Sequence, residues 1–125
     1  MKQRALKVVL ILVGVVFVAG VYPITIFLLH PGQDEATVPM MLSLYVALGI
    51  FLIIAARDPP ANRSLIAYAG WANIAHAAVM IIQSFQLHAE RMHLLIGVAM
   101  FGIIGLVLIA LVPAKTPVPR PSPVT

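Results

Sequence analysis

One apolar stretch of the sequence, residues 65–85, carries polar and sulfur-containing side chains at regular intervals. Their spacing of three or four positions places them on one face of a helix. Imidazole, amide and thioether groups can hydrogen-bond a small molecule, relay a proton or ligate a haem iron. We therefore expect a ligand-binding surface on this helix. Its residues are Asn73, His76, Met80, Gln83 and the nearby Trp71.

His76 is the only ionisable residue near the middle of an apolar stretch. Because polar groups are costly in hydrocarbon, we expect its face of the helix to turn toward the interior of a bundle. Three interpretations remain open. The polar side chains hydrogen-bond neighbouring helices, at about 0.6–2 kcal/mol each, or they form a pocket for a small molecule or lipid quinone. Alternatively, His76 ligates a haem with a second ligand from Met40, Met41 or Met100.

Two loops carry a second group of side chains, which can bind a metal ion. Imidazole and carboxylate groups are ligands for Zn²⁺ or Cu²⁺, and Asp34 and Glu35 lie in one of these loops. The spacing matches no metal-binding motif, so solvated loop residues are the alternative interpretation. The metal candidates are His30, His88, Glu90 and His93.

Arg57 and Arg63 flank a short loop, RDPPANR, between two apolar stretches. Guanidinium groups at a membrane surface can bind lipid phosphate, so these arginines are candidates for a lipid-headgroup site. The alternative is that they only fix the orientation of the chain in the membrane.

Four apolar stretches must position these groups: 8–29, 38–56, 65–86 and 94–112. At about 1.5 Å per residue, each can cross a hydrocarbon layer of about 30 Å. With 62% hydrophobic and 10% charged residues among 125, the chain is unsuited to a soluble domain. We predict an all-α, four-helix transmembrane bundle over residues 1–112, followed by a disordered, proline-rich cytoplasmic tail at 113–125.

The first apolar stretch is longer than the apolar part of a signal peptide, so we expect it to remain as a membrane span. Pro23 lies inside it and predicts a kink near Gly20, because proline cannot donate the helical hydrogen bond. No internal repeat is evident in the sequence.

Seven of the eight Lys and Arg residues fall on one side of the expected bundle, and only Arg91 falls on the other. The positive-inside rule places both termini in the cytoplasm, in an up-down-up-down arrangement. This imbalance argues against exporters that insert in both orientations, and it explains the net charge of +4 without nucleic-acid binding. No span contains Asp or Glu, which disfavours an antiporter with a membrane-embedded acid.

Three segments support a family resemblance: AARDPPANRSLIAYAGWANIAHAAVMIIQ, VAGVYPIT and YVALGIF. They resemble a family of small bacterial four-helix membrane proteins that is defined only as a domain of unknown function. The resemblance covers most of the chain apart from the proline-rich tail. It implies a multi-pass inner-membrane protein, and it implies no established activity and no catalytic residues.

The leading hypothesis is a non-enzymatic accessory or small-ligand-binding subunit whose third span lines the interior. One alternative is a redox membrane component that binds haem or quinone near His76, and another is a small oligomeric channel or transporter. The sequence has no cysteine and no nucleophile elbow, P-loop, HExxH or Rossmann signature, which argues against an enzyme. The expected partners are the lipid bilayer and a homo-oligomer or larger membrane complex, and no cofactor is predicted.

Overall fold

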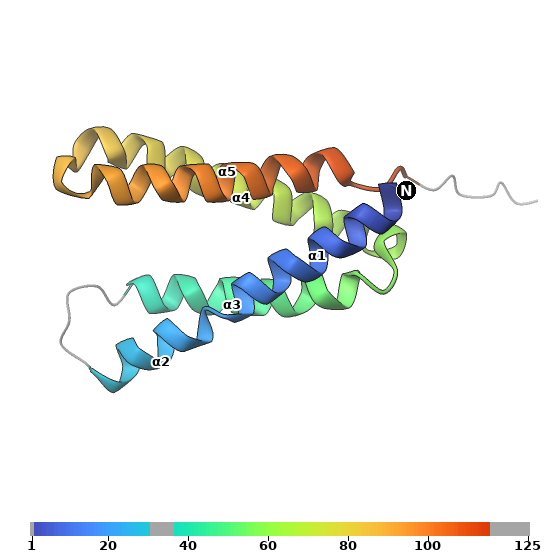
Figure 1. The fold of residues 1–125 in the computed structure, drawn as a ribbon, viewed down its shortest axis with the longest axis horizontal. Coiled ribbons are helices and arrows are strands. Elements are labelled where there is room, and N and C mark those ends of the chain that lie inside the picture. Colours follow the sequence, from blue (N-terminus) through green and yellow to red (C-terminus); the bar gives the residue numbers. More distant parts are fainter. Residues whose placement is uncertain (1, 31–36, 116–125) are drawn as a thin grey trace, which may run out of the picture.

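The computed structural model describes residues 2–30 and 37–115, and within them the chain is all-α. The first apolar segment comprises α1 (Lys2–Val18) and α2 (Val21–Leu29), and the second is α3 (Thr37–Ala55) (Figure 1). The third comprises a 3₁₀ turn, η1 (Pro59–Asn62), and α4 (Arg63–Gln86). The fourth comprises another 3₁₀ turn, η2 (His88–Glu90), and α5 (Arg91–Leu111).

All four segments are long and apolar enough to cross a membrane, and they pack together as a bundle. The predicted all-α bundle of four helical segments is therefore confirmed, and the helix ends lie within a few residues of the expected ends for all segments but the first. Helices suit lipid because each satisfies its own backbone hydrogen bonds. The loop expected around Asp34 and the tail from residue 116 onward lie outside the described residues.

The first span is broken between Val18 and Val21, which confirms the kink predicted near Gly20. Pro23 falls in the first turn of α2, where a helix needs no amide donors. The backbone bridges the break with hydrogen bonds from the amide of Gly20 to the carbonyl of Phe17, 3.0 Å, and from that of Tyr22 to Ala19, 3.1 Å. Beyond the break, α2 packs on α3 and buries none of its residues.

The bundle consists of two helical hairpins, α1 with α3 and α4 with α5, each joined by a close glycine crossing. A Cβ atom built on Gly49 would lie 2.7 Å from the carbonyl oxygen of Gly14. A Cβ atom built on Gly105 would lie 2.8 Å from the carbonyl oxygen of Gly70. Small residues allow helix backbones to approach this closely in lipid, where dispersion contacts drive association.

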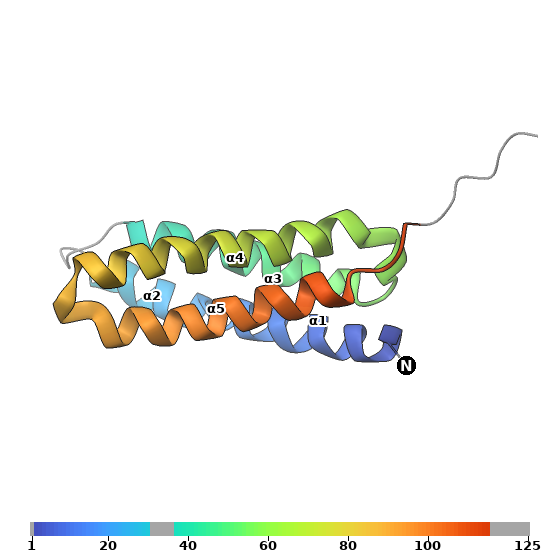
Figure 2. The same ribbon diagram turned by 90° about the horizontal axis from the view of Figure 1, so that it is seen from above.

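The two hairpins are structural repeats offset by 56 residues, since Gly70 and Gly105 follow Gly14 and Gly49 by that number. The contacts agree: α1 touches α5, and the corresponding helices α4 and α3 touch each other. In Figure 2, α4 and α5 lie in front of α3 and α1, and this pattern of contacts is the one that a pseudo-two-fold axis parallel to the helices produces. The same offset relates other buried residues: Leu10 and Ile66, Val13 and Ala69, Phe17 and Asn73, Leu52 and Leu108.

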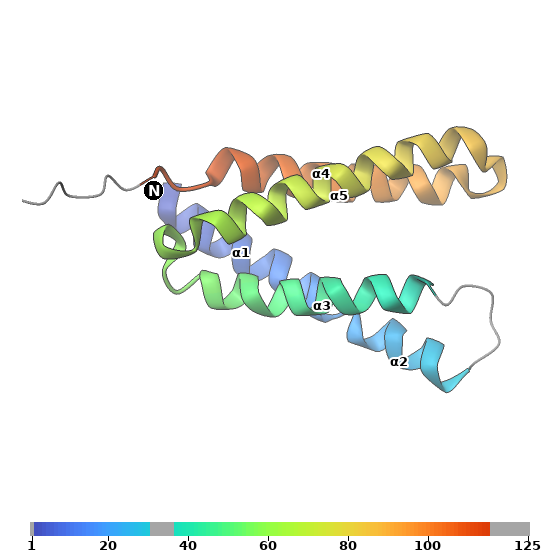
Figure 3. The same cartoon turned by 180° about the vertical axis from the view of Figure 1, so that it is seen from behind.

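The apolar core lies toward one end of the bundle, the end at which Lys2 and Leu111 lie, called here the terminal end. Its fully buried members include Leu6, Leu10, Leu52, Ile66 and Leu108. Toward the opposite end, which carries η2 and is called the turn end, the hairpins diverge (Figures 1 and 3). Packing between the hairpins is therefore concentrated in one half of the bundle.

The glycine crossing of the second hairpin can be tested with one added methyl group. We expect Gly105→Ala to lower the stability by about 1–3 kcal/mol, as overpacking does, because the methyl group meets the Gly70 carbonyl and the side chain of Ile74. Gly102→Ala in the same helix is the control, since a Cβ atom there meets nothing within 4 Å. Thermal denaturation in mild detergent measures both, and equal midpoints would contradict the importance of the crossing.

Candidate ligand-binding cleft

A cleft of about 540 Å³ opens at the turn end, between α3 of one hairpin and α4, η2 and α5 of the other. It brings together members of two groups that are separate in the sequence. One is the polar stripe of α4, defined as Asn73, His76, Met80 and Gln83, and the other is the metal-candidate group, which supplies Glu90 and His93. The stripe supplies three cleft residues, His76, Met80 and Gln83, and the remainder of the lining is mixed. These further lining residues are Thr37, Val38, Met41, Leu87 and Leu94.

His76 is the cleft residue of α4 that lies farthest from the turn end, and aromatic rings pack against it. Its ring meets Phe101 edge-on, with centroids 4.4 Å apart, and Tyr45 with centroids 5.6 Å apart. Tyr45 in turn meets Phe17 at 5.0 Å, so each of the four spans contributes one ring. No hydrogen bond within the described residues engages the ring nitrogens of His76, which leaves them available to a ligand.

Met80 and Gln83 continue the wall of the cleft from His76 toward the turn end. Gly97 of α5 makes room for Met80, because a Cβ atom there would collide with the thioether. Both side chains are half-buried, and Gln83 shares the cleft with Thr37 across from it on α3. The wall thus combines a flexible thioether with an amide that can donate or accept hydrogen bonds.

Two residues of the predicted ligand-binding surface do not line the cleft. Trp71 is 62% exposed on the outside of the bundle. Asn73 is fully buried, and its Nδ2 donates to the carbonyl of Ala69 in its own helix at 2.7 Å. The interpretation that Asn73 hydrogen-bonds a neighbouring helix is therefore wrong, and its Oδ1 has no partner among the described residues.

The metal candidates are not assembled into a site by the described residues. His88 Nδ1 accepts a hydrogen bond from Arg91, whose Nε also donates to the carbonyl of Ser84 at 2.9 Å. His30 instead lies at the end of α2, where its Nδ1 is 3.2 Å from the carbonyl oxygen of Ile26. Within residues 2–30 and 37–115, no three His, Asp or Glu side chains lie together as a metal site requires.

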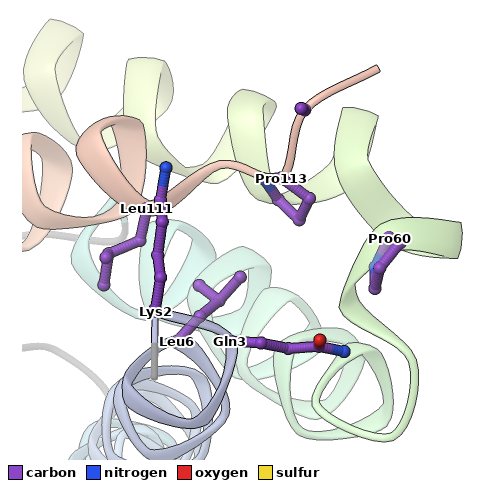
Figure 4. Close-up of a pocket in the computed structure, with 7 residues that line it drawn as sticks. Lys2, Gln3, Leu6, Pro60, Leu111 and Pro113 are labelled. Atoms are coloured by element: carbon purple, nitrogen blue, oxygen red, sulfur yellow. The ribbon is translucent and has the colours of Figure 1, made fainter. Parts of the chain in front are cut away.

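The arginines proposed for lipid headgroups differ in their surroundings. Arg63 Nε donates to the carbonyl of Pro113 at 2.8 Å and so fastens the end of the fourth span to the start of α4. Arg57 is exposed at the terminal end. A small pocket of about 240 Å³ lies nearby, and its charged lining residue is Lys2 rather than either arginine (Figure 4).

Tyr45, Phe101 and Thr37 are site residues that the sequence did not reveal. In the sequence, Tyr45 resembles any aromatic residue that packs in a helical bundle, and Phe101 lies in a uniformly apolar stretch. Tyr45 and Phe101 are 56 residues apart, which makes them equivalent positions of the two repeats. This offset was the signal in the sequence that could have identified them as a pair.

The comparisons with known proteins agree with the resemblance carried by the sequence. Residues 1–123 match the profile of a family of unknown function, DUF6632. The chain belongs to this family. No curated protein and no solved structure matches it. Membership of DUF6632 covers the whole described bundle and brings no assigned activity, so the function of this DUF6632 protein must be argued from the cleft itself.

The buried amide of the DUF6632 protein makes a testable contribution to stability. An unpaired buried carbonyl oxygen costs about 1–3 kcal/mol, so we expect Asn73→Leu to raise the melting temperature of the purified protein. Gln83→Leu, at a half-buried cleft position, is the control and should change it little. A loss of stability in Asn73→Leu would show that Oδ1 has a partner, such as a bound water.

Proposed function

We propose that the protein binds a small, neutral amphipathic molecule of the lipid-quinone type in the cleft at its turn end. The observation that carries this proposal is the convergence of His76, Gln83, Glu90 and His93 on one cavity from three elements. Ligand sites are typically apolar cavities with a few placed polar groups, and this cleft has that composition.

The chemistry of the lining supports a neutral ligand head. His76 and Gln83 lie on one face of α4, about 10 Å apart along the helix axis at 1.5 Å per residue. An imidazole and an amide can each hydrogen-bond a carbonyl oxygen of a quinone ring. Val38, Met41 and Leu94 supply the apolar wall, and no Lys or Arg lines the cleft to favour a phosphate.

The repeat supports a functional role for the polar stripe. The residues 56 positions before His76, Met80 and Gln83 are Gly20, Ile24 and Phe27, which carry no polar side chain. The first hairpin thus forms its span without polar residues at these positions. Because polar groups in a membrane interior are costly, a role beyond packing explains why the second hairpin carries them.

A redox protein that binds haem is the second candidate, because the cleft contains two imidazoles and two thioethers. His76 and His93 line it together with Met41 and Met80, and these are the residue types that ligate haem iron. A pore through one chain has less support, since the core at the terminal end fills the bundle beyond the cleft. An absorption spectrum of the purified protein separates haem from a colourless ligand.

Cleft variants test the proposed function directly. We expect His76→Leu and Gln83→Leu each to weaken binding of decyl-substituted benzoquinone about tenfold, the value of one hydrogen bond of about 1.4 kcal/mol. Titration calorimetry and native mass spectrometry of detergent-purified protein measure the affinity. His30→Leu is the matched control, because His30 lies outside the cleft. Unchanged affinity in both cleft variants would overturn the proposal.

We place both termini in the cytoplasm on the basis of the Lys and Arg distribution, so the cleft opens to the opposite face of the inner membrane. The chain has no cysteine, so single-cysteine variants carry no background. We expect a membrane-impermeant maleimide added to intact cells to label Ala89→Cys in η2 and to leave Ala61→Cys in η1 unlabelled. The reverse pattern would invert the orientation.

A further inference from the structure

A second cavity of about 320 Å³ runs along the seam between α3 and α4, in the terminal half of the bundle. Its lining is apolar apart from tyrosine hydroxyl groups, and it opens toward the lipid. Leu44 and Tyr68 on its rim are 72% and 66% exposed. The full set from the two helices is Leu44, Tyr45, Ala47, Leu48, Phe51, Leu65, Tyr68 and Ala72. We call this cavity the seam groove.

The seam groove continues the cleft along the same two helices. On α3 the cleft residues end at Met41 and the groove residues begin at Leu44, and on α4 the cleft ends at His76 and the groove begins at Ala72. The two cavities border each other at Tyr45, which lines the groove, and His76, which lines the cleft, and the centroids of these rings are 5.6 Å apart. From Thr37 to Phe51 the combined path is about 21 Å long at 1.5 Å per residue.

The repeat allows the seam that holds this groove to be compared with the equivalent seam of the bundle. The pseudo-two-fold axis relates the seam of α3 and α4 to that of α5 and α1. Some groove residues have counterparts of similar bulk, such as Leu48 with Ile104, whereas Phe51 and Tyr68 have smaller counterparts, Val107 and Leu12. The counterparts of Ala47 and Ala72, however, are Ile103 and Val16, which are larger. At these two positions the seam that holds the groove therefore carries smaller side chains than the equivalent seam.

We propose that the seam groove holds the hydrocarbon tail of the ligand whose head occupies the cleft. This inference rests on the proposed function and narrows the ligand to a tailed amphiphile that enters sideways from the bilayer. The order of the two cavities along the bundle suits an amphiphile. The polar groups lie at the turn end, where a head meets the membrane surface, and the apolar groove lies deeper.

The test fills the groove with the residues of the equivalent seam. The double variant Ala47→Ile/Ala72→Val adds bulk that the repeat already accommodates at Ile103 and Val16. The probes are decyl-substituted benzoquinone and the same ring with a methyl group in place of the decyl chain. We expect the double variant to lose at least tenfold in affinity for the decyl probe and to bind the methyl probe like the unaltered protein, which also shows that it is folded.

The control variant Ala75→Ile/Ala78→Val adds the same atoms to exposed positions of α4 outside both cavities, and both affinities should stay unchanged. Equal decyl affinity in the groove-filled and unaltered proteins would overturn the inference and leave the proposed function intact. Equal affinity of the unaltered protein for the decyl and methyl probes would also overturn the inference and leave the proposed function intact. If the unaltered protein binds neither probe, the proposed function fails and the inference fails with it.

Discussion

The close approach of helix backbones at two pairs of glycines is the constraint on which this bundle depends. Lipid tails are as apolar as the side chains of the protein, so helices in a membrane gain little from burying apolar surface and rely on tight packing. Gly14 with Gly49 and Gly70 with Gly105 give each hairpin that packing. The hairpins are therefore the strongly packed units, and the contact between them is smaller and lies toward the terminal end. A cleft at the other end follows from this division, because nothing draws the diverging hairpins together there.

The two repeats share a packing scheme and differ in chemistry, and the difference marks the residues that the fold does not require. Where the first hairpin buries Phe17, the second buries Asn73, which leaves a carbonyl oxygen unpaired among the described residues. Where the first hairpin has the break at Gly20, the second has a continuous α4 that carries His76. In the half of the bundle near the turn end, the first hairpin has an interrupted helix, and the second hairpin has a continuous helix with polar side chains. Both departures border the same half of the bundle, where packing between hairpins is weakest.

The sequence predicted the spans, the kink and the polar face of α4 because each depends on local composition and periodicity. It did not predict the repeat, since buried positions tolerate exchanges such as Val13 with Ala69 and few identical residues remain. The sequence analysis also grouped Trp71 with the ligand-binding residues. Each step along a helix turns the side chain by about 100 degrees, so a residue close in sequence can lie on another face, as Trp71 does. The joining of His93 and Glu90 to the stripe on α4 depends on how the η2 turn folds back, which only tertiary structure specifies.

The position of His76 connects the stability of the bundle with the proposed binding of a ligand. Its ring is packed between Tyr45 and Phe101, so its orientation is fixed by contacts that also join α3, α4 and α5. In the proposed function, a ligand group that hydrogen-bonds this half-buried ring is partly shielded from water, and a hydrogen bond there is stronger than at an exposed site. The cleft and the seam groove border each other at the same rings, so the boundary between polar and apolar surroundings falls at Tyr45 and His76. A molecule with a polar head and an apolar tail matches that boundary, whereas a wholly polar or wholly apolar molecule matches only one side of it.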